Sequence, residues 1–462
     1  MTSTTATKPS VRGPSRRCSA GSTKLGDTKL PPLCPCEDGG WMLEIGDWMA
    51  RSILVIGTLD TKGDEVGYLR EQIARRGHDT IVMDVGILGE PALQADVTHQ
   101  EVAAARGSNL DELRAGGDPS TGSGHGRRQA VQIMMEGATH IAQELHQTGR
   151  LSGVIAVGGG TGTHIGTGVM RALPMGVPKL MVSTVASRDM SQEIGTRDIT
   201  LMHSVVDMLG LNAVSRKLLA NAAGAIVGMV ETEVELAPTR PLVGLTVFGF
   251  CTKGAMHVKP LLEARGYEMV AFHANGTGGM ALEDLIEQGL ISGVVDFATH
   301  EFADQLHDGY CGGIGPGRLE AAGRQGIPQV VVPGGLDCIV LEFDSPETTP
   351  PQFRDRKIFW YDFRSGVRTS VEEMRVLART IADKLNQARG PVKVVIPLRG
   401  WSEADEEGAP LHEPETNAVF VEEMKQLLDP HIEIVEVDAH INEPRFAQVV
   451  VEVFEALMQK KE

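Results

Sequence analysis

An apolar run leads directly into a small polar turn in the stretch Ile53-Leu54-Val55-Ile56-Gly57-Thr58-Leu59-Asp60-Thr61-Lys62-Gly63. This pattern predicts a buried strand, then a turn that opens a helix. Unpaired N–H groups and the positive end of the helix dipole point out of such a turn, which suits it to hold an anion. The same arrangement recurs in Leu245-Thr246-Val247-Phe248-Gly249-Phe250-Cys251-Thr252-Lys253-Gly254. Two copies indicate duplicated α/β units, with a ligand near their shared face.

Short apolar runs alternate with helical periodicity from Ile53 onward, which is typical of βαβ units around a parallel sheet. The second half repeats landmarks of the first in the same order. Besides the turn, the matched pairs are 73–82 with 261–270, 151–155 with 291–295, and 176–182 with 326–332. The fold class that we predict is therefore α/β, with two Rossmann-like, doubly wound parallel-sheet domains related by internal duplication.

Composition places the domain boundaries. Residues 1–48 are rich in Ser, Thr, Pro, Gly and Arg, so we expect a disordered tail. A transit peptide is an alternative for this segment, and a translation start at Met49 is another. Pro238 and Pro241 bracket a second change in composition. We therefore expect an N-terminal domain over 49–235 and a C-terminal domain over 236–462.

Periodicity predicts the elements of both halves. We expect helices at 65–76, 127–145, 162–173, 199–230, 370–388 and 415–428. We expect further strands at 80–85, 153–157, 179–184, 392–396 and 432–437.

Charge and composition narrow the class of partner. The formal net charge of -18 argues against a nucleic-acid partner, because such proteins usually present a basic face. We expect no membrane partner, since no apolar stretch approaches the length of a membrane span. The six cysteines are scattered, which is typical of reduced thiols in a cytoplasmic protein rather than of a disulfide framework.

The sharpest local signal is a loop of small residues after a predicted strand, formed by Gly158, Gly159, Gly160, Thr161, Gly162 and Thr163. Small side chains allow the backbone amides to wrap a phosphate at the start of the next helix. The loop is not a Walker A motif, because no G-K-[ST] follows it. The alternative interpretation is a turn that packs tightly against a neighbouring helix.

The first turn offers further nucleotide contacts, namely Thr58, Asp60, Thr61 and Lys62. Lys62 suits phosphate oxygens, and Asp60 suits Mg²⁺, directly or through water. A simpler interpretation is that Asp60 or Thr61 caps the helix and that Lys62 is solvated.

Two more segments complete the expected nucleotide site. Gly124 and Arg127 precede a long helix, and the fork of an arginine binds phosphate well. An ordinary exposed Arg pair is the alternative there. The predicted strand at 179–184 closes on Ser183 and Thr184, which we also assign to the cofactor.

The second half has 297–303 where the first half has its glycine loop, so we expect one nucleotide site per chain. In this segment His300 and Glu301 are candidate acid/base residues. His300, Asp304 and His307 share one helix face and could hold a metal. We favour a helix N-terminus with polar residues that face a cleft.

Several stretches taken in order resemble the family of bacterial and plant proteins related to the tomato mosaic virus resistance protein. They are 57–62, 158–163, 183–187, 204–207, 300–304 and 436–442. The resemblance implies two Rossmann-like domains, ATP bound mainly by the first, and a tendency to form homodimers. It supports Thr61, Lys62, Arg127 and the 158–163 loop as nucleotide contacts. Arg128 and Arg188 stand where that family usually has Gly.

We therefore expect an ATP-binding, Mg²⁺-using cytoplasmic protein. As an enzyme it would act on an unidentified small molecule held between its domains. The alternative is a nucleotide-gated binding or regulatory protein without turnover.

Overall fold

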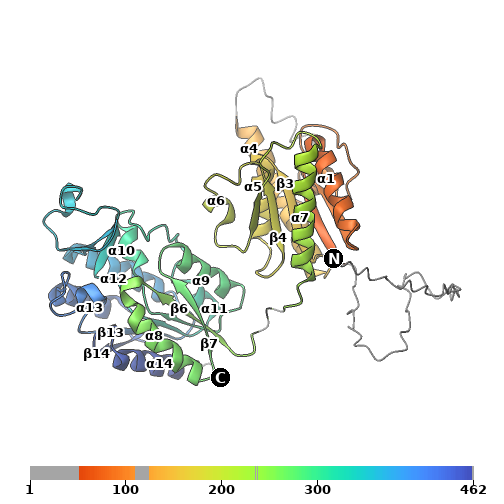
Figure 1. Ribbon diagram of the computed structural model, residues 1–462. Coiled ribbons are helices and arrows are strands. Elements are labelled where there is room, and N and C mark those ends of the chain that lie inside the picture. The colour runs from red at the N-terminus through yellow and green to blue at the C-terminus, as the bar shows by residue number, and fades with distance from the viewer. Residues whose placement is uncertain (1–50, 110–123, 235, 237, 460–462) are drawn as a thin grey trace, which may run out of the picture. The chain divides into compact units, whose positions relative to one another are not determined.

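The computed structural model describes residues 51–109, 124–234, 236 and 238–459 (Figure 1). Two α/β domains lie within these ranges, and each is described by itself. The expected tail at 1–48 lies outside the described residues. The predicted fold class is confirmed, because each domain is built on a parallel sheet covered by helices on both faces.

The N-terminal domain has a five-stranded sheet in the order β2-β1-β3-β4-β5. Its strands are parallel, and β1 pairs with both β2 and β3. Their bounds are β1 Ser52–Gly57, β2 Asp79–Asp84, β3 Gly153–Gly158, β4 Lys179–Ser183 and β5 Thr200–His203. β1 contains the apolar run Ile53–Ile56, which is buried on both faces of the sheet because β1 lies between two other strands.

Helices cover both faces of this sheet. α1 (Leu59–Ala74) and α7 (Ala213–Glu231) pack on the face that contains Val55 and Ile155. The opposite face contains Leu54 and is covered by α2 (His99–Ala104), α4 (Gly124–Gln147) and α5 (Gly160–Arg171). α6 (Ser191–Ile194) follows β4. Because every strand points the same way, all of their carboxyl ends lie at one edge.

The C-terminal domain repeats the design with a six-stranded parallel sheet in the order β14-β13-β9-β8-β6-β7. Its bounds are β6 Leu242–Val247, β7 Glu268–His273, β8 Gly293–Asp296, β9 Gln329–Val331, β13 Val392–Pro397 and β14 Glu433–Val437. Read from β7, the first four strands have the same order as those of the first sheet. This shared order is what the predicted duplication requires.

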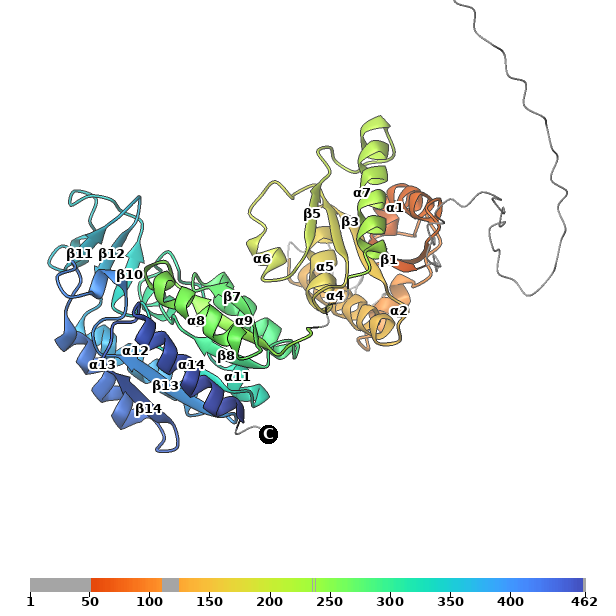
Figure 2. The same ribbon diagram turned by 60° about the horizontal axis from the view of Figure 1, so that its bottom comes forward.

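Two helices cover one face of this sheet, α8 (Thr252–Ala264) and α14 (Pro444–Gln459), which lie side by side (Figure 2). The other face is covered by α9 (Thr277–Glu287), α11 (Ala321–Gln325), α12 (Val371–Leu385) and α13 (Pro414–Leu427). Short helical segments complete the domain, namely α10 (Glu301–Gln305), η2 (Gly249–Cys251), η3 (Pro351–Phe353) and η4 (Glu403–Asp405).

A small antiparallel sheet departs from the repeat, and the sequence analysis did not predict it. It has the order β10-β12-β11, with bounds β10 Cys338–Leu341, β11 Ile358–Trp360 and β12 Ser365–Arg368. Its strands are only three or four residues long, too short for a clear alternating pattern.

The helix predicted at 199–230 is wrong over residues 199–212. Thr200–His203 instead forms β5, which pairs with β4 at the sheet edge. Helix α7 begins only after Asn212, whose side chain accepts hydrogen bonds from the amides of Val214 and Ser215. The apolar residues of β5 also fit a helical pattern, and only their pairing with β4 makes this segment a strand.

Helix α7 also corrects the statement that no apolar stretch approaches a membrane span. Its 19 residues are long and apolar enough to cross a membrane by length and composition alone. A single such helix is weak evidence, since core helices have the same character. Leu219, Ile226 and Val230 pack in the core of the N-terminal domain, which accounts for its composition.

Candidate functional site

The carboxyl edge of the first sheet contains a topological switch point between β1 and β3. The chain leaves β1 toward β2 on one side, and it leaves β3 toward β4 on the other. In open α/β sheets, ligands bind outside the carboxyl ends of the strands at this point. Here the ends are Gly57 with Thr58, and Gly158 with Gly159. The tertiary structure therefore brings the two predicted phosphate turns to neighbouring strands.

The glycine loop needs glycine for a steric reason at Gly158. A Cβ on this residue would lie 2.7 Å from Cα of Gly162, closer than side chains pack against backbone. The amide of Thr163 donates to the carbonyl of Gly159, and the amide of Thr184 donates to the carbonyl of Gly158. The tight-packing interpretation therefore accounts for this one glycine.

Gly160 is different because it is exposed and begins α5. A Cβ there would meet no atom of the described residues within 4 Å. The first amides of a helix have no acceptor within the helix, and the N-cap residue of α5, Gly159, has no side chain to supply one. Space therefore lies open beside the uncapped N-terminus of α5, next to the half-buried residues Gly159, Thr161 and Gly162.

Two of the predicted cofactor contacts bind each other instead of facing outward. The hydroxyls of Thr163 and Ser183 are buried and lie 2.7 Å apart. Ser183 Oγ also accepts a hydrogen bond from the amide of Val185 at 3.1 Å. These contacts join the end of β4 to the first turns of α5. Thr184, the neighbouring prediction, is half-buried.

The helix after β1 begins earlier than predicted, since α1 starts at Leu59 rather than at 65. Neither Asp60 nor Thr61 is the N-cap; that position belongs to Thr58, which makes no side-chain cap bond. The Thr58 and Thr61 hydroxyls lie 2.9 Å apart. Asp60 Oδ2 accepts from the amides of Leu88 and Gly89 at 3.0 and 3.1 Å. Asp60 thus holds the loop that follows β2.

Lys62 is not a solvated surface lysine. Its side chain is half-buried, and Nζ donates to the carbonyl oxygen of Met208, in the segment before α7. The backbone at Lys62 leaves helical geometry, with φ -129° and ψ 18°. The ammonium group therefore binds the backbone of the N-terminal domain instead of extending into solvent.

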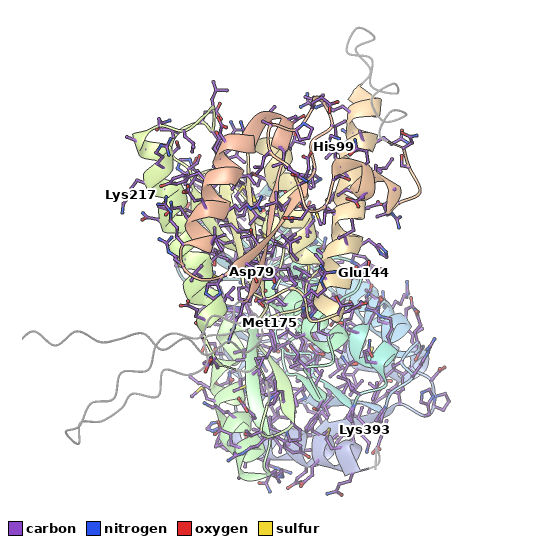
Figure 3. The ribbon with its side chains drawn as sticks, turned by 90° about the vertical axis from the view of Figure 1, so that its right-hand side faces the viewer. Asp79, His99, Glu144, Met175, Lys217 and Lys393 are labelled. Atoms are coloured by element: carbon purple, nitrogen blue, oxygen red, sulfur yellow. The ribbon has the colours of Figure 1, made fainter. Side chains whose placement is uncertain are left out.

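A buried pair at the end of β2 was missed by the sequence analysis. Asp84 Oδ1 accepts from the amides of Leu59 and Gly86, and Oδ2 lies 2.9 Å from Nδ1 of His99. Burial raises the pKa of Asp84 above its usual value. Figure 3 labels His99 on α2, at the opposite end of β2 from Asp79. The sequence did contain a signal for this pair, because Asp84 is an acidic residue at the carboxyl end of a predicted strand.

The arginines of the expected site are all exposed. Gly124 begins α4, and Arg127 lies in its first turn. Because α4 leads back to the start of β3, this end of the helix lies at the carboxyl edge of the sheet. Arg128 and Arg188 are exposed as well.

The second domain places His300 and Glu301 at its own switch point, after β8 and beside β6. Both side chains are fully buried. Glu301 Oε1 accepts from the amides of Gly276 and Gly279 at 2.9 and 3.2 Å, and Oε2 lies 2.8 Å from Nε of Arg318. Glu301 therefore joins the start of α9 to a buried arginine, and its catalytic role stays a prediction.

The ring of His300 is enclosed by other side chains. It stacks on Phe248, with ring centroids 3.7 Å apart. Its Nδ1 lies 2.8 Å from the carbonyl oxygen of Gly335, and Nε2 lies 3.3 Å from Oδ1 of Asp304. Burial lowers the pKa of His300, but the charge of Asp304 together with hydrogen bonds to Asp304, Cys311 and Cys338 outweighs that effect and raises the pKa well above its usual value.

The expected metal face of His300, Asp304 and His307 forms only in part. The ring of His307 turns away, and its Nε2 lies 2.6 Å from Oε1 of Glu373. Cys311 takes the third position instead. Helix α10 ends at Gln305, so the helical spacing that suggested His307 does not extend to it.

Two family models match the chain, over residues 51–235 and 240–458, and are described as the N-terminal and C-terminal domains of uncharacterised protein family UPF0261. A UPF0261 protein of Clostridium tetani is 40% identical over 415 residues, which are 89% of this chain and 100% of that protein. A UPF0261 protein of Brucella suis is 37% identical over 87% of this chain and 94% of its own length. The ToMV susceptible protein tm-1(GCR26) of Solanum lycopersicum is 33% identical over 87% of this chain, which is 55% of that protein.

Among solved structures, a UDP-GlcNAc 2-epimerase from Neisseria meningitidis bound to UDP-GlcNAc matches 61% of this chain and 82% of its own. The identity is 8% and the TM-score is 0.23, a likeness too low to carry an argument.

Proposed function

Because the chain belongs to uncharacterised protein family UPF0261, we propose its function from its own residues: the N-terminal domain binds ATP with Mg²⁺. Membership confirms the resemblance seen in the sequence. One observation carries the proposal. Among the residues that the structure describes, the N-terminus of α5 has no side-chain cap from Gly159, is open at Gly160, and lies beside the switch point of the sheet.

The phosphates lie, in this proposal, against the amides at the start of α5, where the helix dipole adds positive potential. Arg127 and Lys62 supply the cationic charge, and Lys62 exchanges the Met208 carbonyl for a phosphate oxygen. Asp60 uses Oδ2 for two backbone amides, so we assign its Oδ1 to Mg²⁺, directly or through water.

Whether ATP is consumed separates two forms of the proposal. As an enzyme, the protein uses ATP on an unidentified small molecule, with His300 or Glu301 as acid/base. As a regulatory protein, it binds ATP without turnover. The burial of both side chains means that the enzyme form requires the second domain to open around them before a substrate reaches them.

The decisive experiment is a calorimetric titration of the full chain with Mg·ATP. A Gly160→Asp variant places a carboxylate beside the amides at a position where an added Cβ meets no described atom within 4 Å. Gly160→Asn has the same shape without the charge and is the matched control. We expect the Asp variant to bind Mg·ATP at least about tenfold more weakly than the Asn variant.

Two outcomes overturn the proposal. One is the lack of measurable Mg·ATP binding by the wild-type chain, and the other is equal binding by the Asp and Asn variants. Phosphate release, measured over a panel of small metabolites, then assigns the enzyme or the regulatory form.

We also propose a cytoplasmic homodimer. The thiols of Cys251, Cys311 and Cys338 are free and buried, which suits a reducing compartment. The dimer rests on the family resemblance alone, and light scattering of the purified chain tests it.

A further inference from the structure

The C-terminal domain contains a compact group of three potential metal ligands, His300, Asp304 and Cys311. Their ligand atoms all lie within 4.8 Å of one another. His300 and Asp304 have no exposed surface, and Cys311 is 3% exposed. An imidazole, a carboxylate and a thiol rarely share such an apolar site without a reason, because each polar group loses its water.

The imidazole of His300 presents an unused atom to this group. Its Nδ1 lies 2.8 Å from the carbonyl oxygen of Gly335 and donates its proton there. That contact turns Nε2 toward the group: it is buried, it makes no hydrogen bond to any residue that the structure describes, and it lies 3.3 Å from Oδ1 of Asp304. A histidine that ligates a metal usually donates its other N–H to a backbone carbonyl in this way.

The carboxylate of Asp304 is held in place by the backbone. Its Oδ1 accepts from the amide of Val340 at 2.7 Å, and its Oδ2 accepts from the amide of Cys311 at 2.7 Å. The second bond also brings the thiol of Cys311 back toward the histidine. Hydrogen bonds of this kind orient a carboxylate ligand before a metal arrives.

We propose that the C-terminal domain binds one Zn²⁺ through Nε2 of His300, a carboxylate oxygen of Asp304 and Sγ of Cys311. Mixed nitrogen, oxygen and sulfur ligands are typical of zinc. With zinc–nitrogen and zinc–oxygen bonds of about 2.0 Å, tetrahedral ligands lie about 3.3 Å apart. The distance from His300 Nε2 to Asp304 Oδ1 is 3.3 Å, so this pair already has the required spacing.

Charge balance also favours a dication. The Asp304 carboxylate and a Cys311 thiolate together neutralise Zn²⁺, so the buried site carries no net charge. The thiol proton leaves for solvent as the metal binds during folding.

The competing occupant of this space is a proton on Nε2 of His300, which would pair with Asp304. The two differ in a measurable way, because only a metal forms a bond to sulfur. Zinc itself is spectroscopically silent, whereas Co²⁺ in the same site gives a thiolate charge-transfer band.

The test uses the full chain expressed in minimal medium with Zn²⁺ or Co²⁺ as the added metal, since a buried site fills as the protein folds. Cys311→Ser removes the thiolate ligand. The matched control is Cys251→Ser, at a second buried thiol, whose Sγ lies 3.2 Å from the carbonyl oxygen of Trp401. Metal content by mass spectrometry and the absorption of the Co²⁺ form are the readouts.

We expect about one metal per chain and a thiolate band in wild type and in Cys251→Ser. Cys311→Ser should lose the band and at least about tenfold in metal affinity. If Cys311→Ser fails to fold, X-ray absorption at the zinc edge of wild type decides the question, with a sulfur at about 2.3 Å expected. Metal-free wild-type protein, or an edge spectrum without sulfur, overturns the proposal.

Discussion

The hydroxyl of Thr163 lies 2.7 Å from the hydroxyl of Ser183, and both residues are fully or almost fully buried. This contact joins the first turns of α5 to the end of β4. It therefore anchors the last residue of the glycine loop to the neighbouring strand. Thr163 and Ser183, which the sequence suggested as ligand contacts, therefore hold the loop and the strand together.

Ser183→Ala should destabilise the N-terminal domain by about 1–3 kcal/mol, because it leaves the buried hydroxyl of Thr163 and the amide of Val185 without this acceptor. Urea unfolding measures the loss. Ser187→Ala, at an exposed position of the same segment, is the control and should stay within about 0.5 kcal/mol of wild type. Equal losses for both variants would show that the contact does not stabilise the loop.

Gly158→Ala should cost about 1–3 kcal/mol, because its Cβ would lie 2.7 Å from backbone that cannot move aside easily. Gly160→Ala should instead be neutral or stabilising by up to about 1 kcal/mol, since the space there is open and alanine favours a helix. Thermal unfolding of the two variants makes the comparison. A fall in Tm for Gly160→Ala as large as that for Gly158→Ala contradicts this account.

Asp60→Ala should loosen the loop after β2, because the amides of Leu88 and Gly89 lose a charged acceptor. We expect hydrogen exchange at these two amides to be about tenfold faster. Asp64→Ala, an exposed position on the same helix, should leave both rates unchanged. Unchanged exchange in Asp60→Ala would mean that other contacts hold this loop.

Glu373 gives a prediction for acid stability. Burial raises its pKa, but hydrogen bonds from Arg356, the amide of Ser370 and His307 outweigh that effect and lower it to about 2. The unfolded chain binds this proton near the ordinary value of 4.5, so the carboxylate stabilises the folded state above pH 4.5. That stability, at most about 3 kcal/mol, is lost as the pH falls from 4.5 toward 2.

Glu373→Gln should therefore destabilise the C-terminal domain most at neutral pH, with a difference from wild type that shrinks below pH 4.5. Urea unfolding at several pH values provides the measurement. The exposed neighbour Glu372 supplies the control as Glu372→Gln, which should show no such dependence. A difference that is constant from pH 7 to pH 3 would rule out the carboxylate as its source.

Much of the fold follows from local pattern. The apolar run that became β1 and the glycine at its end predict a strand and turn, because strands and helix starts have local requirements. Residues 199–212, which were predicted as part of a helix, show the limit of this reasoning. Thr200–His203 has no helical or strand preference strong enough to decide alone, and pairing with β4 made it a strand.

The candidate sites divide in the same way. The glycine loop could be predicted because the need for glycine at Gly158 is local: a Cβ there would lie too close to Gly162, only four residues away. The contact of Lys62 with Met208 could not, because it spans 146 positions of sequence. Cys311 was missed for a related reason: it joins His300 and Asp304 through a backbone turn rather than through helical spacing.

The sequence by itself determined the two parallel-sheet domains, their duplication and the small residues of the glycine loop. Periodicity and glycine placement act over a few residues, so they can be read along the chain. Only the tertiary structure decided which polar groups face open space and which bind one another. Burial and hydrogen bonding depend on residues that folding brings together from distant parts of the chain, and no local pattern records them.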